Sequence, residues 1–172
     1  MNILSDASFE TDKENDMSPN RDNRAADVGL LLVRAVLAAV FIYHGGQKLF
    51  GLFGGYGIQG TAGWMASVGI PFPLVSTVLV GVTEFFGGLV LLLGTGARVA
   101  AIPMAFSMLV AVLTVHRTAF DSRAGGMEFP LTLAVVLAAL SLIGPGSLTV
   151  GRLLARRQKD DFAARPARPA TA

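Results

Sequence analysis

Six ionisable side chains in this sequence stand within or directly beside long apolar runs, where charge is costly. Histidine titrates near neutral pH, lysine and carboxylate groups can hold or pass a proton, and arginine can hold an anion. Surrounded by hydrocarbon, such groups turn toward one another or toward a ligand. The six candidates for a ligand-binding or structural polar cluster are Arg34, His44, Lys48, Glu84, His116 and Glu128.

Three of these residues share one face of the first apolar run. At 100° per residue in a helix, Arg34, His44 and Lys48 fall within about 80° of one another. A rise of 1.5 Å per residue puts Arg34 and Glu84 at depths about 7 Å apart, within reach of an extended arginine. One interpretation is therefore a buried Arg34–Glu84 ion pair that fixes the register of two helices.

A second interpretation is a polar pocket that opens to the outside. His44, Lys48, His116 and Glu128 are expected at one outer level, with Glu84 beneath them. Such a pocket could bind a small polar ligand, a quinone headgroup or protons, with the two histidines titrating near neutral pH. A narrower version makes His44 and His116 the axial ligands of a b-type haem. The sequence has only two histidines and neither is expected at mid-membrane, which argues against a haem site.

Glycines at helical spacing predict where helices approach closely, because they bring no side chain to the contact. Gly81 and Gly88 flank Glu84 in this way. The full set of predicted helix-packing glycines is Gly45, Gly51, Gly81, Gly87 and Gly88.

Several kinds of site are not expected. The sequence has no cysteine, which excludes thiolate metal sites and dithiol chemistry within this chain. It has no carboxylate-rich or HExxH metal motif, no phosphate-binding glycine loop and no nucleophile elbow, so no metal site is predicted. A net charge of +2, concentrated at the ends, does not suggest nucleic-acid binding.

The composition indicates that these residues are positioned by membrane helices. Hydrophobic residues make up 52% of the chain and charged residues only 15%, and the charges gather at the two ends. A helix needs about 20 apolar residues to cross a bilayer, where other backbone forms are excluded. The predicted fold is an all-α, four-helix transmembrane bundle with spans near 29–50, 73–93, 99–115 and 129–143.

The chain divides into a membrane domain, residues 28–151, and two tails. Residues 1–27 are acidic and polar, as in a disordered tail, and residues 152–172 are basic and also predicted to be disordered. Ten of the fourteen lysines and arginines fall on the side of the tails and the 94–98 turn. This predicts a multi-pass protein of the bacterial cytoplasmic (inner) membrane with both termini cytoplasmic.

The connection over residues 51–72 is rich in glycine and carries Phe53, Tyr56, Trp64 and Phe72. Aromatic residues of this kind favour the headgroup level, so an outward interfacial loop is predicted, with a short helix over 61–68. It could cover a ligand or serve only as an ordinary aromatic belt.

Six segments in order resemble the DoxX family of membrane proteins: LLVRAVLAAVFIYHGGQKLFGLFGG, GWMASVGIPFP, TEFFGGLVLLLGTGAR, MLVAVLTVH, GGMEFPLTLAVVLAAL and GPGSL. The resemblance runs from about residue 30 to 151. It implies a four-helix protein of the bacterial cytoplasmic membrane. The family's name comes from a likeness to the small membrane subunit of an archaeal thiosulfate:quinone oxidoreductase. Some relatives are linked to oxidative-stress assemblies with superoxide dismutase and a sulfurtransferase.

The family has no agreed catalytic set, so the resemblance implies only positions of its recurring motif. In this sequence they are Arg34, His44, Gly45, Lys48, Gly51, Glu84, Gly87, Gly88, His116 and Glu128. The absence of cysteine argues against a thiol-based role for this chain acting alone.

Three functional hypotheses follow. The first is a partner-dependent subunit of a membrane redox or thiol/sulfur-stress system, not catalytic alone, that serves a quinone-linked oxidoreductase through membrane or soluble partners. The second is a small permease or proton-coupled carrier using Glu84. Four helices would enclose only a thin-walled pathway, so a carrier of this kind is expected to form a homo-oligomer. The sequence has no internal repeat of the kind that many carriers show, which argues against this hypothesis. The third is a scaffold that holds soluble enzymes by its basic C-terminal tail, which could equally bind anionic lipid.

Overall fold

Helices account for nearly all of the structure, a computed structural model that describes residues 19–163. Within this range there is no β-strand, which agrees with the predicted all-α class. The α-helices are α2 (Pro19–Phe50), α3 (Gly57–Ser67), α4 (Pro73–Leu93), α5 (Ala97–Thr114), α6 (Glu128–Ile143) and α7 (Val150–Ala163), joined in part by the 3₁₀ turns η1 (Leu52–Gly54) and η2 (Ser122–Ala124).

Within residues 19–163, three helices are long and apolar enough to cross a membrane: the Arg24–Phe50 part of α2, α4 and α5. Helix α6 is also apolar but has 16 residues, about 24 Å of helix. Large apolar side chains cover the outer faces of these helices, with Leu79 63%, Phe106 66% and Leu142 80% exposed. Apolar surface on this scale is strongly unfavourable in water, so the solvent around these helices is hydrocarbon.

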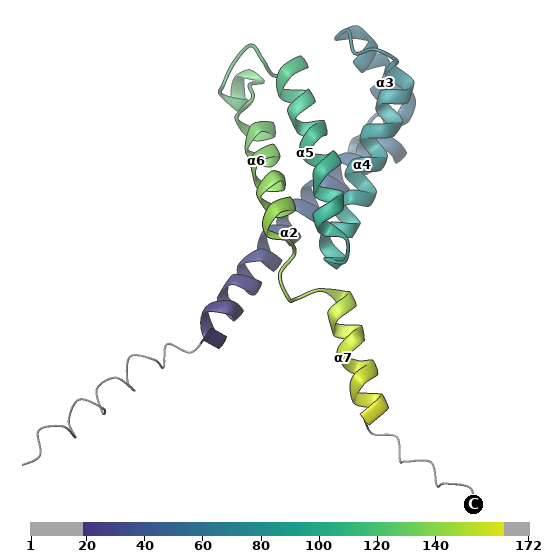
Figure 1. The fold of residues 1–172 in the computed structure, drawn as a ribbon. Helices are drawn as coiled ribbons and strands as arrows, with labels where there is room; N and C mark the ends of the chain where they lie inside the picture. The colour runs from purple at the N-terminus through teal and green to yellow at the C-terminus, as the bar shows by residue number, and fades with distance from the viewer. Residues whose placement is uncertain (1–18, 164–172) are drawn as a thin grey trace, which may run out of the picture.

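One buried cluster joins the four apolar helices. Helix α2 packs along α4, and α5 lies between α4 and α6 (Figure 1). Every one of these helices contributes apolar side chains to the cluster: Leu37, Ala38, Phe41, Leu91, Ala97, Ala101, Met104, Leu133, Leu137 and Leu140.

Two glycines bring α2 and α4 into backbone contact. A Cβ added at Gly45 would lie 2.4 Å from the backbone nitrogen of Phe85. A Cβ at Gly88 would lie 3.0 Å from the backbone nitrogen of Ile42. The α2–α4 crossing is therefore held by van der Waals contact that no larger residue at Gly45 allows.

The other three predicted packing glycines lie at separate contacts. A Cβ at Gly81 would meet the side chain of Leu49, and one at Gly87 would lie 2.6 Å from the sulfur of Met104 on α5. Gly51 instead has a φ of 68° and ends α2, because a left-handed residue cannot continue the helix.

The predicted tails differ from the structure in part. Helix α2 begins at Pro19, a favoured first helical residue, so the expected boundary at residue 28 falls inside a helix. Helix α7 occupies much of the C-terminal segment expected to be disordered, because its Leu, Ala, Arg, Gln and Lys residues favour a helix. The remaining parts of both predicted tails, 1–18 and 164–172, lie outside the described residues.

Candidate functional site

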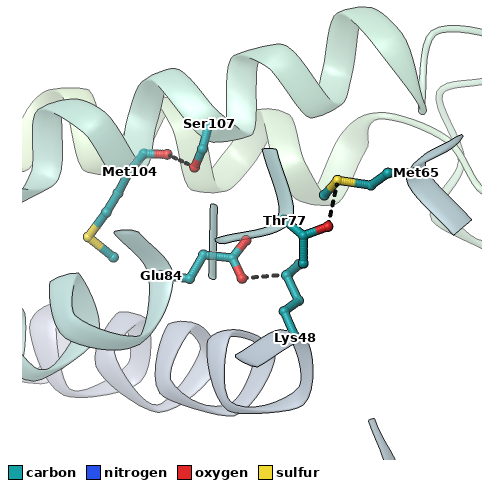
Figure 2. Close-up of polar contacts among 6 residues, drawn as sticks. All are labelled: Lys48, Met65, Thr77, Glu84, Met104 and Ser107. Atoms are coloured by element: carbon teal, nitrogen blue, oxygen red, sulfur yellow. Dashed lines mark hydrogen bonds and ion pairs between the residues drawn. The ribbon is translucent and has the colours of Figure 1, made fainter. Parts of the chain in front are cut away.

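A buried ion pair lies where α2 and α4 cross. Lys48 Nζ is 2.5 Å from Glu84 Oε2 (Figure 2). The side chain of Glu84 is 3% exposed and that of Lys48 is 23% exposed. A carboxylate removed from solvent to this degree needs a cation beside it, and Lys48 supplies that cation.

Helix α3 packs beside the pair and contacts both α2 and α4. Its Met65 accepts a 3.3 Å hydrogen bond from the hydroxyl of Thr77, which is fully buried on α4. The same oxygen lies 2.8 Å from the carbonyl oxygen of Pro73, so the single hydroxyl hydrogen can be donated to either acceptor. Figure 2 shows Thr77 and Met65 on the α3 side of the Lys48–Glu84 pair.

Thr77 was not among the residues predicted for the site. The signal was present, because Thr77 stands seven residues before Glu84 and so falls on the same face of the helix. The buried residues of α4 follow this spacing in full: Thr77, Gly81, Glu84, Gly88 and Leu91.

The other flank of the site belongs to α5. Met104 is fully buried and lies against Gly87 of α4. The hydroxyl of Ser107 donates to the carbonyl of Met104 at 2.8 Å, so this polar group is satisfied within its own helix. Glu84 thus lies among α2, α4 and α5 with Lys48 as its charged partner (Figure 2).

His44 stands one helical turn before Lys48 on α2, but it is not part of the ion pair. Its side chain is exposed, and its ring stands edge-on to Tyr43 at a centroid distance of 5.4 Å. Tyr43 in turn stacks on Phe53 of η1 at 4.8 Å. The structure therefore places His44 in an aromatic group at the surface, one turn from Lys48.

Two aromatic residues of the 51–72 connection hold a strained backbone. Phe53 has a φ of 54° and Phe72 a φ of 49°, in the left-handed region that residues with a Cβ rarely adopt. Such conformations cost about 1–3 kcal/mol each and persist only where surrounding contacts impose them. The connection is thus a shaped segment rather than a plain linker, and it joins the C-terminal end of α2 to the N-terminal end of α4.

Arg34 forms a separate site. Its side chain is fully buried, and Nη2 donates to the carbonyl of Leu148 at 2.5 Å. Nε and Nη1 have no hydrogen-bond partner among the described residues. The guanidinium lies against Gly94, where an added Cβ would come within 1.8 Å of Nη1.

The predicted Arg34–Glu84 pair is therefore wrong, and helix register explains why. Gly45 lies against Phe85, and α2 and α4 run in opposite directions. Eleven residues earlier, α2 has moved about three turns along α4, to its C-terminal end. Arg34 consequently reaches Gly94, while the cation one turn from Gly45 is Lys48.

His116 and Glu128 belong to a third group, with His116 in the loop between α5 and α6 and Glu128 at the start of α6. His116 Nδ1 is 2.7 Å from the carbonyl oxygen of Gly125. Glu128 accepts a 3.1 Å hydrogen bond from the backbone N–H of Ser122. Their partners are loop groups, not His44 or Lys48, so the six residues do not form one cluster.

No group of three or more His, Cys, Asp or Glu residues able to hold a metal ion occurs within the described part of the chain. The chemistry available at the α2–α4 crossing is therefore that of a shielded ammonium–carboxylate pair. It can donate hydrogen bonds and exchange protons in an apolar environment.

Comparison with known proteins gives the chain a family. Residues 29–117, just over half of the sequence, match the DoxX family model. The chain belongs to the DoxX family. The matched segment contains Arg34, His44, Lys48, Glu84 and His116, so the ion pair lies within the part that defines the family.

Three curated relatives match nearly their whole length. The chain is 25% identical over 138 residues to the candidate oxidoreductase CatD of Bacillus subtilis (strain 168), covering 80% of this chain and 96% of the relative. It is 31% identical over 133 residues to the inner membrane protein YqjF of Escherichia coli (strain K12), covering 76% and 95%. It is 28% identical over 134 residues to the inner membrane protein YphA of the same organism, covering 74% and 91%. No solved structure matches the chain.

Proposed function

We propose that this chain is a multi-pass protein of the bacterial inner membrane that serves as a partner-dependent subunit of a membrane redox or thiol/sulfur-stress system. Helices α2, α4, α5 and α6 cross the bilayer as a four-helix bundle, both termini are cytoplasmic, and the 51–72 connection faces outward. Two relatives named as inner membrane proteins and one named as a candidate oxidoreductase support this assignment.

The observation that carries the redox role is the buried Lys48–Glu84 pair beside α3. An ammonium group has three N–H donors, and the pair uses one of them for Glu84. Lys48 is partly exposed while Glu84 is not, so the free donors lie on the accessible side of the pair. A carbonyl oxygen on an otherwise apolar ligand is the acceptor that such a site recognises.

A quinone headgroup has this chemistry. Lys48 would donate to a quinone carbonyl oxygen, Glu84 would hold the charge of the lysine, and α3 would exclude water from both. The quinone, when bound, supplies two-electron carriage between a partner enzyme and the membrane pool. The carbonyl-to-ammonium hydrogen bond is expected to contribute about 1.5–3 kcal/mol because the donor is charged.

The test uses Trp64, which is the only tryptophan of the chain and lies on α3. Protein in lipid nanodiscs is titrated with a short-chain quinone while Trp64 fluorescence is recorded. We expect saturable quenching that weakens at least about tenfold in Lys48→Met and in Glu84→Gln, in keeping with the loss of one charged hydrogen bond.

The matched control is Arg123→Gln, which removes a charge from the exposed η2 turn and should leave quenching unchanged. Quenching that rises linearly with quinone, equally in all variants, would reflect partition into lipid alone and would refute the quinone site.

A proton-coupled carrier is the second candidate, favoured by the 3% exposure of Glu84 within a chain of membrane helices. Proton flux into proteoliposomes that disappears with Glu84→Gln, without quinone-dependent quenching, would support the carrier in place of the redox subunit.

A further inference from the structure

The bundle end from which α7 departs carries a shallow, open depression of about 480 Å³. The α4–α5 turn, the early part of α2 and the 144–149 loop meet there (Figure 1). Two arginines, Arg98 of α5 and Arg152 of α7, line the depression together with Asp27, Ile143 and Ser147. None of these residues takes part in the Lys48–Glu84 site.

Hydrogen bonds fix the walls of this depression. Asp27 accepts from the backbone N–H of Ser147 at 2.6 Å, and its other carboxylate oxygen accepts from the Ser147 hydroxyl. Arg98 Nη2 donates to the carbonyl of Ile143 at 2.9 Å. The hydrogen bonds of Asp27 and of one nitrogen of Arg98 therefore fix the position of the 144–149 loop from two sides.

The remaining charge favours an anion. Arg98 and Arg152 bring two positive charges against the one negative charge of Asp27, which attracts Arg152, so the lining keeps a net charge of +1. Arg98 keeps further N–H donors, and the Arg152 side chain has no hydrogen-bond partner among the described residues. Arg98 also stands in the first turn of α5, an 18-residue helix whose N-terminal end is positive. Arg34 adds a buried positive charge behind the loop, bound to the carbonyl of Leu148. Guanidinium groups match phosphate oxygens with paired donors.

The surface beside the depression suits an acyl chain. Ile143 lines the depression and is 65% exposed, and its neighbour Leu142 is 80% exposed. On α5, Val99 and Ile102 are 71% and 59% exposed, directly after Arg98. An anion with apolar tails can therefore occupy the depression and the lipid-facing side of α5 and α6 together.

We propose that this depression binds the phosphate headgroup of an anionic phospholipid. Arg98 and Arg152 contact the phosphate oxygens, and the acyl chains follow the exposed apolar faces of α5 and α6. A basic pocket at the membrane–water boundary between membrane helices is a recognised setting for such headgroups. Binding here also fixes α7, since Arg152 lies in its first turn. This proposal depends on membrane insertion but not on the redox role, so the two can fail separately.

Native mass spectrometry of the detergent-purified chain provides the test, with phosphatidylglycerol, phosphatidylcholine and inorganic phosphate as probes. We expect one phosphatidylglycerol to be retained at least about tenfold better than phosphatidylcholine, because two charged contacts are at stake. Millimolar inorganic phosphate should neither bind alone nor displace the lipid.

Arg152→Gln should remove most of this preference, and Arg98→Gln/Arg152→Gln should abolish it. The control Arg157→Gln/Lys159→Gln removes two positive charges from exposed positions of α7 outside the depression and should keep it. Arg98→Gln also breaks the bond to Ile143, so the single Arg152→Gln variant decides if the double variant does not fold. Equal retention of the two lipids, equal losses in Arg152→Gln and the control, or binding of phosphate without lipid would each overturn the proposal.

Discussion

At the scale of single residues, the environment of Glu84 determines what each change at the α2–α4 crossing does. Its carboxylate is almost completely shielded and Lys48 is its charged partner. Removing one member of such a pair leaves an uncompensated charge in an apolar site, whereas replacing both with apolar groups can be nearly neutral. Each member of the pair therefore depends on the other, while the pair as a whole adds little net stability.

This difference gives a prediction for a double-mutant cycle. Lys48→Met alone is expected to destabilise the protein by about 3–5 kcal/mol, because Glu84 is left buried without its cation. Lys48→Met combined with Glu84→Leu is expected to recover most of that loss. Unfolding midpoints in mild detergent measure both variants. If the double variant lost the sum of the two single losses, the side chains would not be coupled.

At the scale of helices, the contact between α2 and α4 depends on two glycines. A Cβ at Gly45 would overlap the backbone of Phe85, and backbone cannot move aside as a flexible side chain can. Gly29, in the same helix, has no atom within 4 Å of the position its Cβ would take. The same substitution therefore has opposite consequences at the two sites.

We expect Gly45→Ala to lower stability by about 1–3 kcal/mol or more, the usual effect of overpacking. Gly29→Ala should be neutral or stabilise by up to about 1 kcal/mol, since alanine favours a helix. Thermal unfolding of both variants in the same detergent measures the difference. Equal effects of the two substitutions would mean that α2 and α4 are not in backbone contact.

Helices were predicted well from the sequence because hydropathy is a local property. The apolar runs place α4 within its observed bounds, and the glycine spacing around Glu84 identifies the face that α4 buries. The 57–67 helix was expected as a shorter one over 61–68. Helix α7 was missed because a basic, polar composition was interpreted as disorder despite its helix-forming residues.

The pairing of charges was not predictable in the same way. The membrane depths of Arg34 and Glu84 are each estimated from the expected ends of their own helix. An error of a few residues in these ends is enough to bring Arg34 to the level of Glu84. The true register is set by close packing at Gly45 and Gly88, which involves residues distant in sequence. The surface position of His44 was not predictable either, because helical spacing shows which residues share a face but not what that face contacts.

At the scale of the whole molecule, apolar residues cover the outside while charges gather at the two ends and in one buried pair. The belt that includes Leu79 and Phe106 is exposed in the isolated chain, so a bilayer must cover it. Both described ends of the chain lie at one end of the bundle (Figure 1). At the other end of the bundle, α3 lies beside the C-terminal end of α2 and the N-terminal end of α4. The proposed four membrane crossings predict this arrangement, and the excess of arginine and lysine predicts which side is cytoplasmic.

Accessibility of single cysteines tests this central claim most directly, because the chain has no cysteine of its own. An impermeant maleimide is applied to intact and to lysed cells that carry one substitution each: Ala25→Cys, Gln59→Cys, Leu79→Cys or Gln158→Cys. All four positions are exposed in the isolated chain. The cysteine thiolate attacks the maleimide, and this thiolate does not form in hydrocarbon.

We expect Gln59→Cys to react in intact cells, and Ala25→Cys and Gln158→Cys to react only after lysis. Leu79→Cys should react in neither, yet react once the protein is unfolded in sodium dodecyl sulfate. Rapid labelling of Leu79→Cys in the folded protein, or labelling of Ala25→Cys and Gln158→Cys from opposite sides, would contradict the account.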